Sequence, residues 1–410
     1  MRVRVFGGKG NDSIVNTSEV KKLHHATCIY DYASGKNSIT KGDNSRLVLS
    51  DNRNLVEFNR QPVHYDSYLP LPLVYYTPED GVAAGLGIVY MFHRFGEDGY
   101  SNRLRMTDRV STQGNVQVKI NDEFHHLLGR WDLLLNGEMG QPYPTTYFYG
   151  EGNETQKLTT MPVESYQSQI YGYTLFGGLQ RIFWQKSSFN AGILYEHNNA
   201  SLHADNLFQG EEPLLGLDHL DYVGPEATIE IDFRDNALAP KQGARFMTSS
   251  KYLHFNNSDA NYFSNTKVAL EFYQTRSLYL PITLGLKGAF NNTEGDIPFY
   301  KLSTLGRTTG LRGFSRDRFA GHTAASINTQ LAVEFGTIRT VLAPLTFGTF
   351  GFYDVGRIWT PGEKSDKIHN GYGFGIYFTP LFEIFTTRMS VGFSEEEPHG
   401  IFEIGLGIGF

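Results

Sequence analysis

Apolar residues alternate with small or polar residues over most of the chain, from about Gly81 to Phe410. The last run is the clearest example: its apolar residues are Phe402, Ile404, Leu406, Ile408 and Phe410, with Glu403, Gly405, Gly407 and Gly409 between them. A period of two is typical of a β-strand with one apolar and one polar face. About sixteen such runs occur at intervals of about twenty residues, which suits tilted membrane-spanning strands of about 9–11 residues with their turns.

A soluble β-sandwich also alternates, but its strands are usually only about five or six residues long and its turns lie closer together. Long strands with an apolar outer face and a charged, glycine-rich inner face favour a closed barrel instead. Closure leaves no unpaired backbone edge, and lipid cannot satisfy such an edge. The sequence therefore predicts an all-β fold, a transmembrane antiparallel β-barrel of about sixteen strands, over residues 81–410.

Residues 1–80 follow a different pattern, with short β-like pieces among Asn, Ser, Asp and Lys residues and a proline-rich connector that ends at Pro78. We expect a β-rich N-terminal extension, or the remnant of an upstream domain. The first residues contain no apolar segment typical of a signal peptide, so we expect a mature form or a fragment of a longer protein.

The stretch from Gly7 to Val15, GGKGNDSIV, matches the nonapeptide of calcium-binding parallel β-rolls. Gly8 and Gly10 allow a tight turn, and Asp12 offers hard oxygen ligands. Such sites lie between stacked repeats, and the sequence shows one recognisable copy. The stretch is therefore either a calcium-binding turn or an ordinary turn between two strands.

Composition narrows the class of protein further. The net charge of −7 argues against a general nucleic-acid binder, which is usually basic. The single cysteine, Cys28, excludes an internal disulfide and a site of several thiolates. The mean hydropathy of −0.33 is that of a soluble protein, but only alternate residues of a transmembrane barrel face lipid.

No set of residues has the spacing of a catalytic or metal centre. The adjacent pairs His24–His25 and His125–His126 point to opposite faces of a strand and cannot chelate one ion together. Glu395 to Glu397 are expected to form a solvated turn between the last two strands. We therefore predict that the protein is not an enzyme and uses no cofactor.

The longest polar interruption is the stretch from Gly306 to Gly321, GRTTGLRGFSRDRFAG, between the eleventh and twelfth predicted strands. It carries four arginines and one acid, Asp317. The whole connection has about thirty residues, and loops of that length are usually functional or disordered.

Four segments resemble the superfamily of outer-membrane assembly and secretion barrels, which includes bacterial surface antigens, BamA/TamA-like insertases and two-partner secretion transporters. They occur in the order typical of that superfamily: Asp232 to Phe246, Leu311 to Phe314 (LRGF), Phe352 to Trp359 (FYDVGRIW) and Gly371 to Pro380.

The resemblance implies that the loop folds into the barrel, with the motif Arg312-Gly313-Phe314 locked against Phe352 and Asp354. A confined guanidinium needs a carboxylate or carbonyl partner, and an aromatic face adds a cation–π contact. Either Phe314 or Phe352 is expected to supply that face. Near mid-barrel, Asp232, Arg234 and Asp235 are expected to form ion pairs at the lumen or rim.

The resemblance also implies a seam between the first and last strands, which we place at Gly81 to Phe95 and Gly400 to Phe410. Both strands are rich in glycine, which weakens packing. The residues are Gly85, Gly87, Gly405, Gly407 and Phe410, the last of which also resembles a C-terminal assembly signal.

The implied function is insertion or translocation of polypeptides at the bacterial outer membrane. Its partners would be outer-membrane lipid, a polypeptide substrate and periplasmic accessory proteins, with no nucleic acid. Two alternatives remain open at this point. The barrel is an anchor and exit port for a fused upstream domain, or it is a passive sixteen-stranded porin-like channel.

Overall fold

The computed structural model describes residues 3–17, 19, 27–43, 45–51, 53–57, 65–94, 99–141, 146–158, 160–184, 186–202, 206–208, 214–339, 344–380 and 386–409. The chain forms two compact units, residues 1–69 with 90–104, and residues 70–89 with 105–410. Within the described ranges, no helix is long and apolar enough to cross a membrane.

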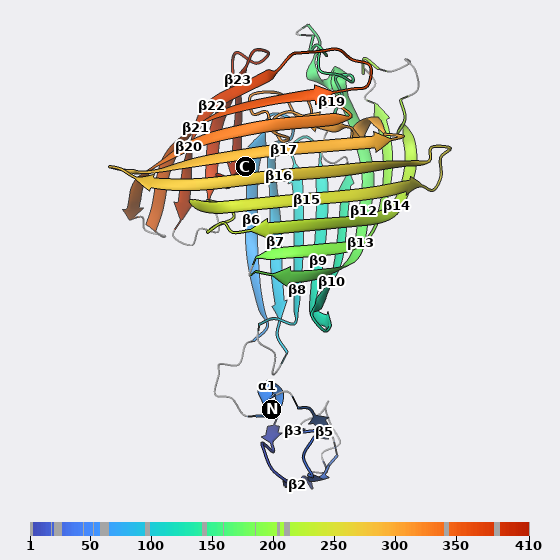
Figure 1. The fold of residues 1–410 in the computed structure, drawn as a ribbon, viewed down its shortest axis with the longest axis vertical. Helices are drawn as coiled ribbons and strands as arrows, with labels where there is room; N and C mark the ends of the chain where they lie inside the picture. Colours follow the sequence, from blue (N-terminus) through green and yellow to red (C-terminus); the bar gives the residue numbers. More distant parts are fainter. Residues whose placement is uncertain are drawn as a thin grey trace. The chain divides into compact units, whose positions relative to one another are not determined.

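Sixteen strands of the described chain close into one antiparallel barrel, which confirms the predicted fold (Figure 1). In chain order they are β6 (Ser67–Thr77), β7 (Gly81–Phe92), β8 (Asn102–Ser111), β9 (Val116–Leu128), β10 (Trp131–Gln141), β12 (Gln167–Phe183), β13 (Ser187–Leu202), β14 (Asp218–Asp232), β15 (Gln242–Phe255), β16 (Tyr262–Ser277), β17 (Pro281–Gly295), β20 (Thr323–Arg339), β21 (Pro344–Trp359), β22 (His369–Pro380), β23 (Thr387–Ser394) and β24 (Ile401–Leu406). A short strand, β11 (Thr146–Tyr147), pairs with the start of β12.

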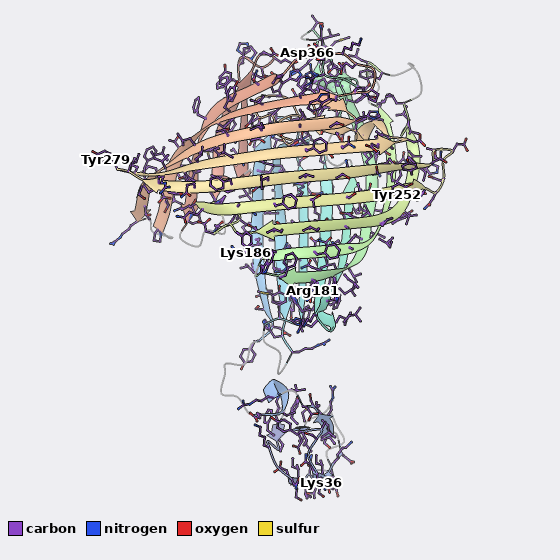
Figure 2. The ribbon with its side chains drawn as sticks, viewed as in Figure 1. Lys36, Arg181, Lys186, Tyr252, Tyr279 and Asp366 are labelled. Atoms are coloured by element: carbon purple, nitrogen blue, oxygen red, sulfur yellow. The ribbon has the colours of Figure 1, made fainter. Side chains whose placement is uncertain are left out.

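The period of two separates an apolar outer face from a polar lumen. On β22, Tyr372, Phe374 and Ile376 are exposed on the outer surface, as is Tyr252 on β15 (Figure 2). The lumen holds buried polar side chains: Glu271 on β16, Asn328 and Gln330 on β20, and Asp354 on β21. This arrangement places apolar side chains toward lipid and leaves charged groups inside, where other side chains pair with them.

The structure corrects the expected start of the barrel. The first strand is β6, which lies before the boundary expected between residues 80 and 81 and pairs with the last strand. Pro70 and Pro72 lie within it. Proline removes a backbone donor and is tolerated in sheets mainly on edge strands, so the prolines made this segment resemble a connector. As a consequence, Gly85 and Gly87 lie on the second strand, β7.

The N-terminal unit contains two small parallel sheets. The strands β1 (Val3–Phe6), β3 (Thr27–Asp31) and β5 (Ser45–Leu49) form one, and β2 (Ser13–Val15) and β4 (Ser38–Thr40) form the other. A single helical turn, α1 (Arg53–Val56), follows β5.

The connection between β17 and β20 contains most of the remaining regular structure. It includes a 3₁₀ turn, η2 (Phe299–Lys301), and two short strands, β18 (Ser303–Leu305) and β19 (Phe319–Gly321), which pair with each other. A second 3₁₀ turn, η1 (Val163–Tyr166), precedes β12. We call residues 306–321 the arginine loop, since it carries Arg307, Arg312, Arg316 and Arg318.

Candidate functional site: the arginine loop and the strand seam

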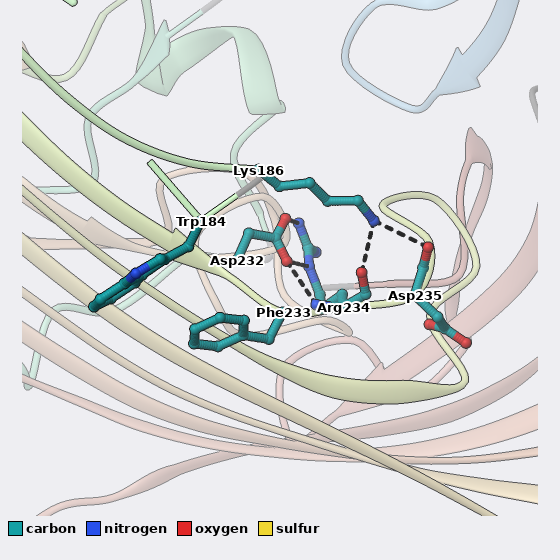
Figure 3. Close-up of a pocket in the computed structure, with 6 residues that line it drawn as sticks. All are labelled: Trp184, Lys186, Asp232, Phe233, Arg234 and Asp235. Carbon is teal, nitrogen blue, oxygen red and sulfur yellow. Dashed lines mark hydrogen bonds and ion pairs between the residues drawn. The ribbon is translucent and has the colours of Figure 1, made fainter. Parts of the chain in front are cut away.

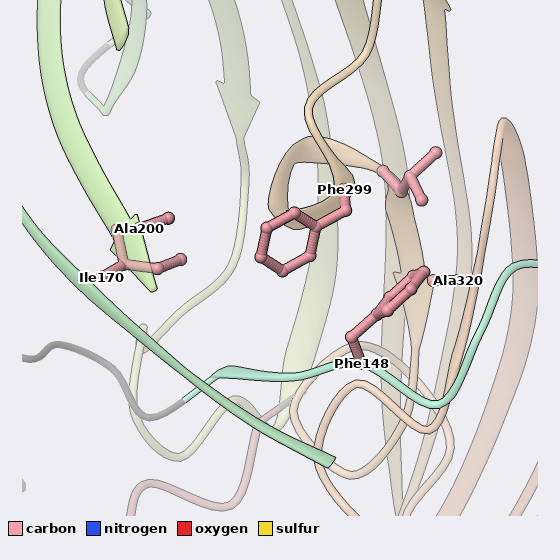
Figure 4. Packing of buried hydrophobic residues seen from close by; sticks show 6 residues of the cluster. Phe148, Ile170, Ala200, Phe299 and Ala320 are labelled. Atoms are coloured by element: carbon pink, nitrogen blue, oxygen red, sulfur yellow. The ribbon is translucent and has the colours of Figure 1, made fainter. Parts of the chain in front are cut away.

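The arginine loop is anchored by two apolar clusters. Leu305, Leu311, Phe314, Phe319, Ala324 and Ile358 form one cluster, and all are buried. At the base of the connection, Phe299 packs among side chains from several strands and loops, which Figure 4 shows from close by. The members of this second cluster are Phe148, Ile170, Ala200, Phe299, Leu302 and Ala320. The loop is therefore held against the inner wall by a core of its own.

Arg312 contacts Asp354 on β21 through three donors. Its backbone N–H lies 3.0 Å from Oδ2, its Nε 2.8 Å from Oδ2 and its Nη2 2.7 Å from Oδ1. Asp354 is fully buried, and the Arg312 guanidinium lies 4.0 Å from the centre of the Phe352 ring. The bidentate geometry and the aromatic face are the arrangement that best compensates a desolvated charge.

The other aromatic of the motif has a different place. Phe314 is fully buried and packs edge-on against Phe319, with the two ring centres 5.5 Å apart. Of the two candidates for the cation–π face, the structure therefore assigns the role to Phe352.

Glycine is required where the loop meets the wall. Gly313 has φ +95°, and a Cβ there would lie 2.3 Å from the carbonyl oxygen of Phe393 on β23. On β22, a Cβ at Gly371 would lie 1.8 Å from the carbonyl oxygen of Arg312. Two backbones therefore approach more closely than any side chain allows.

The other three arginines of the loop bind acids near the two ends of the barrel sequence. Arg316 donates from Nη2 to Asp80, at 2.6 Å, in the turn between β6 and β7. Arg307 donates from Nη1 to Glu403 on β24, at 2.7 Å, and from Nη2 to Glu79. Arg307 therefore bridges the turn after the first strand and the last strand.

Arg318 is fully buried and donates from Nη2 to Glu396, at 2.7 Å, in the turn between β23 and β24. The neighbouring Glu397 accepts hydrogen bonds from Ser315 and Lys157. This corrects the expectation of a solvated turn at Glu395 to Glu397, because Glu396 pairs with Arg318 of the loop and Glu397 is bound by Ser315 of the loop and by Lys157.

Burial alone would raise the pKa of Asp80, which is only 3% exposed, but the hydrogen bonds and charge of Arg316 hold that pKa below its ordinary value. Thr77 and Asn115 also donate to the Asp80 carboxylate, at 3.1 and 2.9 Å. Asp80 is therefore ionised and fully coordinated at neutral pH.

The seam between β24 and β6 has one backbone register pair in the described chain, Ile404 with Tyr76. On its other side, β24 pairs with β23 over the whole span from Ile401 to Leu406. Since a strand normally gains stability from ladders on both sides, the first and last strands are joined far more weakly than their neighbours.

After Leu406 the chain turns into the lumen. Gly407 has φ +75° and donates its N–H to the carbonyl of Thr386. Ile408 donates to the carbonyl of Leu238, at 2.7 Å, and accepts from Nε2 of Gln330, at 2.6 Å. Phe410, predicted as a seam residue, lies outside the described residues.

Gln330 joins this C-terminal segment to the arginine loop, because its Oε1 accepts a hydrogen bond from Nη1 of Arg312, at 2.8 Å. A cavity of about 370 Å³ lies between the loop, β6 and β24. The charged residues of its lining are Lys287, Arg307, Arg312, Arg388 and Glu403. The interior face of the seam is therefore hollow, and its arginines are paired with the acids Glu79, Glu403 and Asp354.

The mid-barrel motif lies where β14 ends. Arg234 pairs with Asp232, with Nη2 2.8 Å from Oδ2, and with Glu271 on β16, with Nη1 3.0 Å from Oε2. Lys186 donates to the carbonyls of Arg234 and Asp235, and Figure 3 shows these side chains around a surface pocket with Trp184 and Phe233.

Asp235 does not join the ion pairs. Its carboxylate accepts backbone hydrogen bonds from Asn236 and Lys241 and so shapes the turn. That same turn carries Leu238, whose carbonyl holds the C-terminal segment.

The structure also brings together residues that the sequence did not suggest. Nδ1 of His125 on β9 lies 3.2 Å from Asp132 on β10, and its Nε2 lies 3.4 Å from Glu123. These three side chains lie close enough to share a metal ion. The sequence hides this group because Asp132 lies on the next strand, so the three residues form no short motif.

These features define a class of protein: a closed barrel of sixteen strands with an arginine loop folded into its lumen and a weak junction between its first and last strands. The chain belongs to the Omp85 superfamily, whose domain matches residues 85–410. This is a superfamily of outer-membrane β-barrels that insert or transport proteins. No curated protein matches the sequence.

Solved structures support the fold. BamA from Haemophilus ducreyi lacking POTRA domains 1–3 is 14% identical, with a TM-score of 0.61 over 83% of this chain and 69% of that chain. CdiB from Acinetobacter baumannii is 13% identical, with a TM-score of 0.50 over 83% and 59%. CdiB from Escherichia coli is 11% identical, with a TM-score of 0.52 over 88% and 65%. The chain therefore spans less than two thirds of each CdiB chain.

Proposed function

We propose that this protein inserts or translocates polypeptides at the bacterial outer membrane by opening between β24 and β6. The observation that carries the proposal is the single register pair, Ile404 with Tyr76, at that junction. Membership of a superfamily of insertases and transporters supports the same class of function. The substrate is a polypeptide, and periplasmic accessory proteins would deliver it.

The physical basis is strand addition. Separation of β24 from β6 exposes backbone N–H and C=O groups on both strands, and an incoming polypeptide in extended form can pair with them. Pro70 and Pro72 remove two donors from β6, so β6 offers an incomplete ladder. β24 carries no proline, so we assign the templating edge to β24.

Side chains of the arginine loop hold the seam closed in this proposal. Arg307 contacts Glu403 on one side of the junction and Glu79 on the other. Arg312 fixes the loop to the wall through Asp354 and Phe352 and so keeps Arg307 in place. Opening would therefore begin with loss of the Arg307 bridge, while the Arg312 lock keeps the loop inside the barrel.

A disulfide across the seam tests the proposal. Tyr76→Cys with Ile404→Cys, in a Cys28→Ser background, joins the two residues of the register pair. We expect the oxidised protein in liposomes to lose insertion of an unfolded barrel polypeptide, and reductant to restore it. The control is Tyr353→Cys with Tyr372→Cys, a register pair within the wall, which should keep full activity.

Full activity of the oxidised seam variant would contradict the proposal. Conductance of the reduced protein in planar bilayers gives an independent reading. A stable, ion-selective current would identify a passive channel instead, whereas opening of the seam should produce variable current that the disulfide suppresses.

A further inference from the structure

The N-terminal turn Gly7–Asp12 lies in a stack of two similar turns. The strands on either side of this turn, β1 and β2, pair in parallel with β3 and β4, the strands on either side of the next turn. Phe6 pairs with Tyr30 before the turns, and Ser13 with Ser38 and Val15 with Thr40 after them. The next turn therefore runs from Tyr32 to Asn37, and its sequence, YASGKN, is a degenerate copy of GGKGND. The second, stacked repeat, which the sequence alone did not make recognisable, is thus present in the structure.

Asp12 and Asn37 occupy equivalent positions in the two turns, since the residues that follow them, Ser13 and Ser38, pair in register. Asn37 closes its own turn by donating from Nδ2 to the carbonyl of Tyr32, at 3.3 Å. Asp12 has no such donor, because an ionised carboxylate only accepts. Its Oδ2 is buried and has no hydrogen-bond partner among the described residues.

A second carboxylate approaches the same turn. Asp31, at the end of β3, is fully buried and lies against Gly7, where a Cβ would be 2.5 Å from its Oδ1. Oδ1 accepts from the N–H of Tyr32, at 2.8 Å, but Oδ2 has no partner within the described chain. An unpaired buried charge is costly, so these two oxygens, one on the turn and one beside Gly7, favour a bound cation.

We propose that the turn Gly7–Asp12 binds Ca²⁺ together with Asp31. Ca²⁺ takes six to eight hard oxygen ligands in flexible geometry, and carboxylates and backbone carbonyls both serve. Gly8 and Gly10, with φ of +81° and +145°, adopt the left-handed backbone that a tight turn needs. Asp31 is not part of the nonapeptide and supplies the second negative charge. This site is independent of the function proposed for the barrel.

Calorimetric titration of the chelator-treated full chain in detergent with CaCl₂ tests the site. We expect saturable binding by the wild type and a loss of affinity of about tenfold or more in Asp31→Asn, because affinity follows the number of charged ligands. Asp43→Asn, an exposed acid in the same unit, is the matched control and should bind as the wild type does. Absence of binding by the wild type, or unchanged affinity in Asp31→Asn, would overturn the proposal.

Asp12→Asn gives a sharper test that does not depend on loss of fold. In the second turn, Asn37 shows that asparagine fits this position without a cation. Asp12→Asn should therefore weaken calcium binding and at the same time increase the protection of residues 3–49 from hydrogen exchange in EDTA. Wild-type protection should instead rise on addition of Ca²⁺. If calcium leaves the wild-type exchange unchanged, the proposed site is wrong.

Discussion

The wall of the barrel and its seam are built from similar strands but are closed by different forces. Between β16 and β17, every residue from Phe263 to Ser277 has a register partner. Between β24 and β6, the described chain has one pair. The wall between β16 and β17 is a continuous backbone ladder, whereas the seam depends on side chains that reach it from the arginine loop.

Because of this difference, the barrel can remain folded while the junction between β24 and β6 opens. A backbone ladder is lost only by unfolding, because each pair supports its neighbours. An ion pair can exchange partners or accept water without disturbing the strands. A barrel that is strong over most of its circumference and closed by arginine–carboxylate pairs at one junction can therefore open there and remain folded elsewhere.

The largest effect is expected from a substitution that removes the side chain anchoring the arginine loop. Arg312→Ala leaves the fully buried Asp354 without its cation, and loss of one partner of a buried pair typically costs about 3–5 kcal/mol. We expect weaker heat resistance of the compact form on a cold gel and a lower midpoint in urea. Arg339→Ala, an exposed arginine at the other end of β20, is the control.

A double-mutant cycle with Asp354→Ala sharpens this test. If Arg312 and Asp354 form one lock, the two single changes should each be costly and the double change little worse than either. Additive effects would show that Arg312 and Asp354 do not act as one lock.

The second prediction addresses the seam directly. Arg307→Gln keeps polar contact but removes the charge between Glu79 and Glu403, so it should destabilise the closed junction by about 1–3 kcal/mol. Hydrogen exchange should rise in β6 and β24 and stay unchanged in β16 and β17. Equal exchange in all four strands would show that the seam is no weaker than the wall.

The fold was largely predictable because lipid requires every spanning strand to turn apolar side chains outward and to pair all of its backbone groups. Alternation at Tyr372, Phe374 and Ile376 follows from that rule, and so does closure. The first strand was not predicted because Pro70 and Pro72 interrupt the strand pattern, and proline is tolerated in sheets mainly on edge strands or at bulges.

The site was only partly predictable. The partners Arg312 and Asp354 follow from two motifs, but the acids that bind the other arginines lie in turns or, for Glu403, on the last strand, and no motif links them to the loop. Glu79, Glu396 and Glu403 meet the loop only through closure of the barrel, which joins the two ends of the chain. In the N-terminal unit, the second turn was hidden because Asn37 replaces aspartate, and only the strand register reveals the equivalence.

The third prediction concerns the inward turn of the C-terminal segment. Gly407 has φ +75°, and a Cβ there would lie 3.0 Å from the carbonyl of Leu238. Gly407→Ala should cost about 1 kcal/mol through backbone strain and release Ile408 from that carbonyl. The released segment is then free to extend the ladder with β6, so we expect slower hydrogen exchange in β6. Unchanged exchange would mean that the inward turn does not limit the pairing of the seam.

The smallest effect is that of acid on the contact between Arg316 and Asp80. Because the pKa of Asp80 is held below its ordinary value in the folded protein, the contact stabilises the loop at neutral pH and above the unfolded pKa. This stabilisation is lost as the pH falls through the folded pKa. Asp317 acts in the opposite direction, because burial raises the pKa of its carboxyl and protonation in acid relieves that cost.

The variant Asp80→Asn separates the two groups. Its single amide oxygen can still accept the hydrogen bond that Asn115 donates to Oδ1, its amide nitrogen replaces the oxygen that accepts from Thr77, and the group cannot titrate. Between about pH 7 and pH 3, hydrogen exchange of residues 306–321, corrected for intrinsic rates, should rise in the wild type and remain flat or fall in Asp80→Asn. An equal rise in both proteins would assign the acid sensitivity to a group other than Asp80.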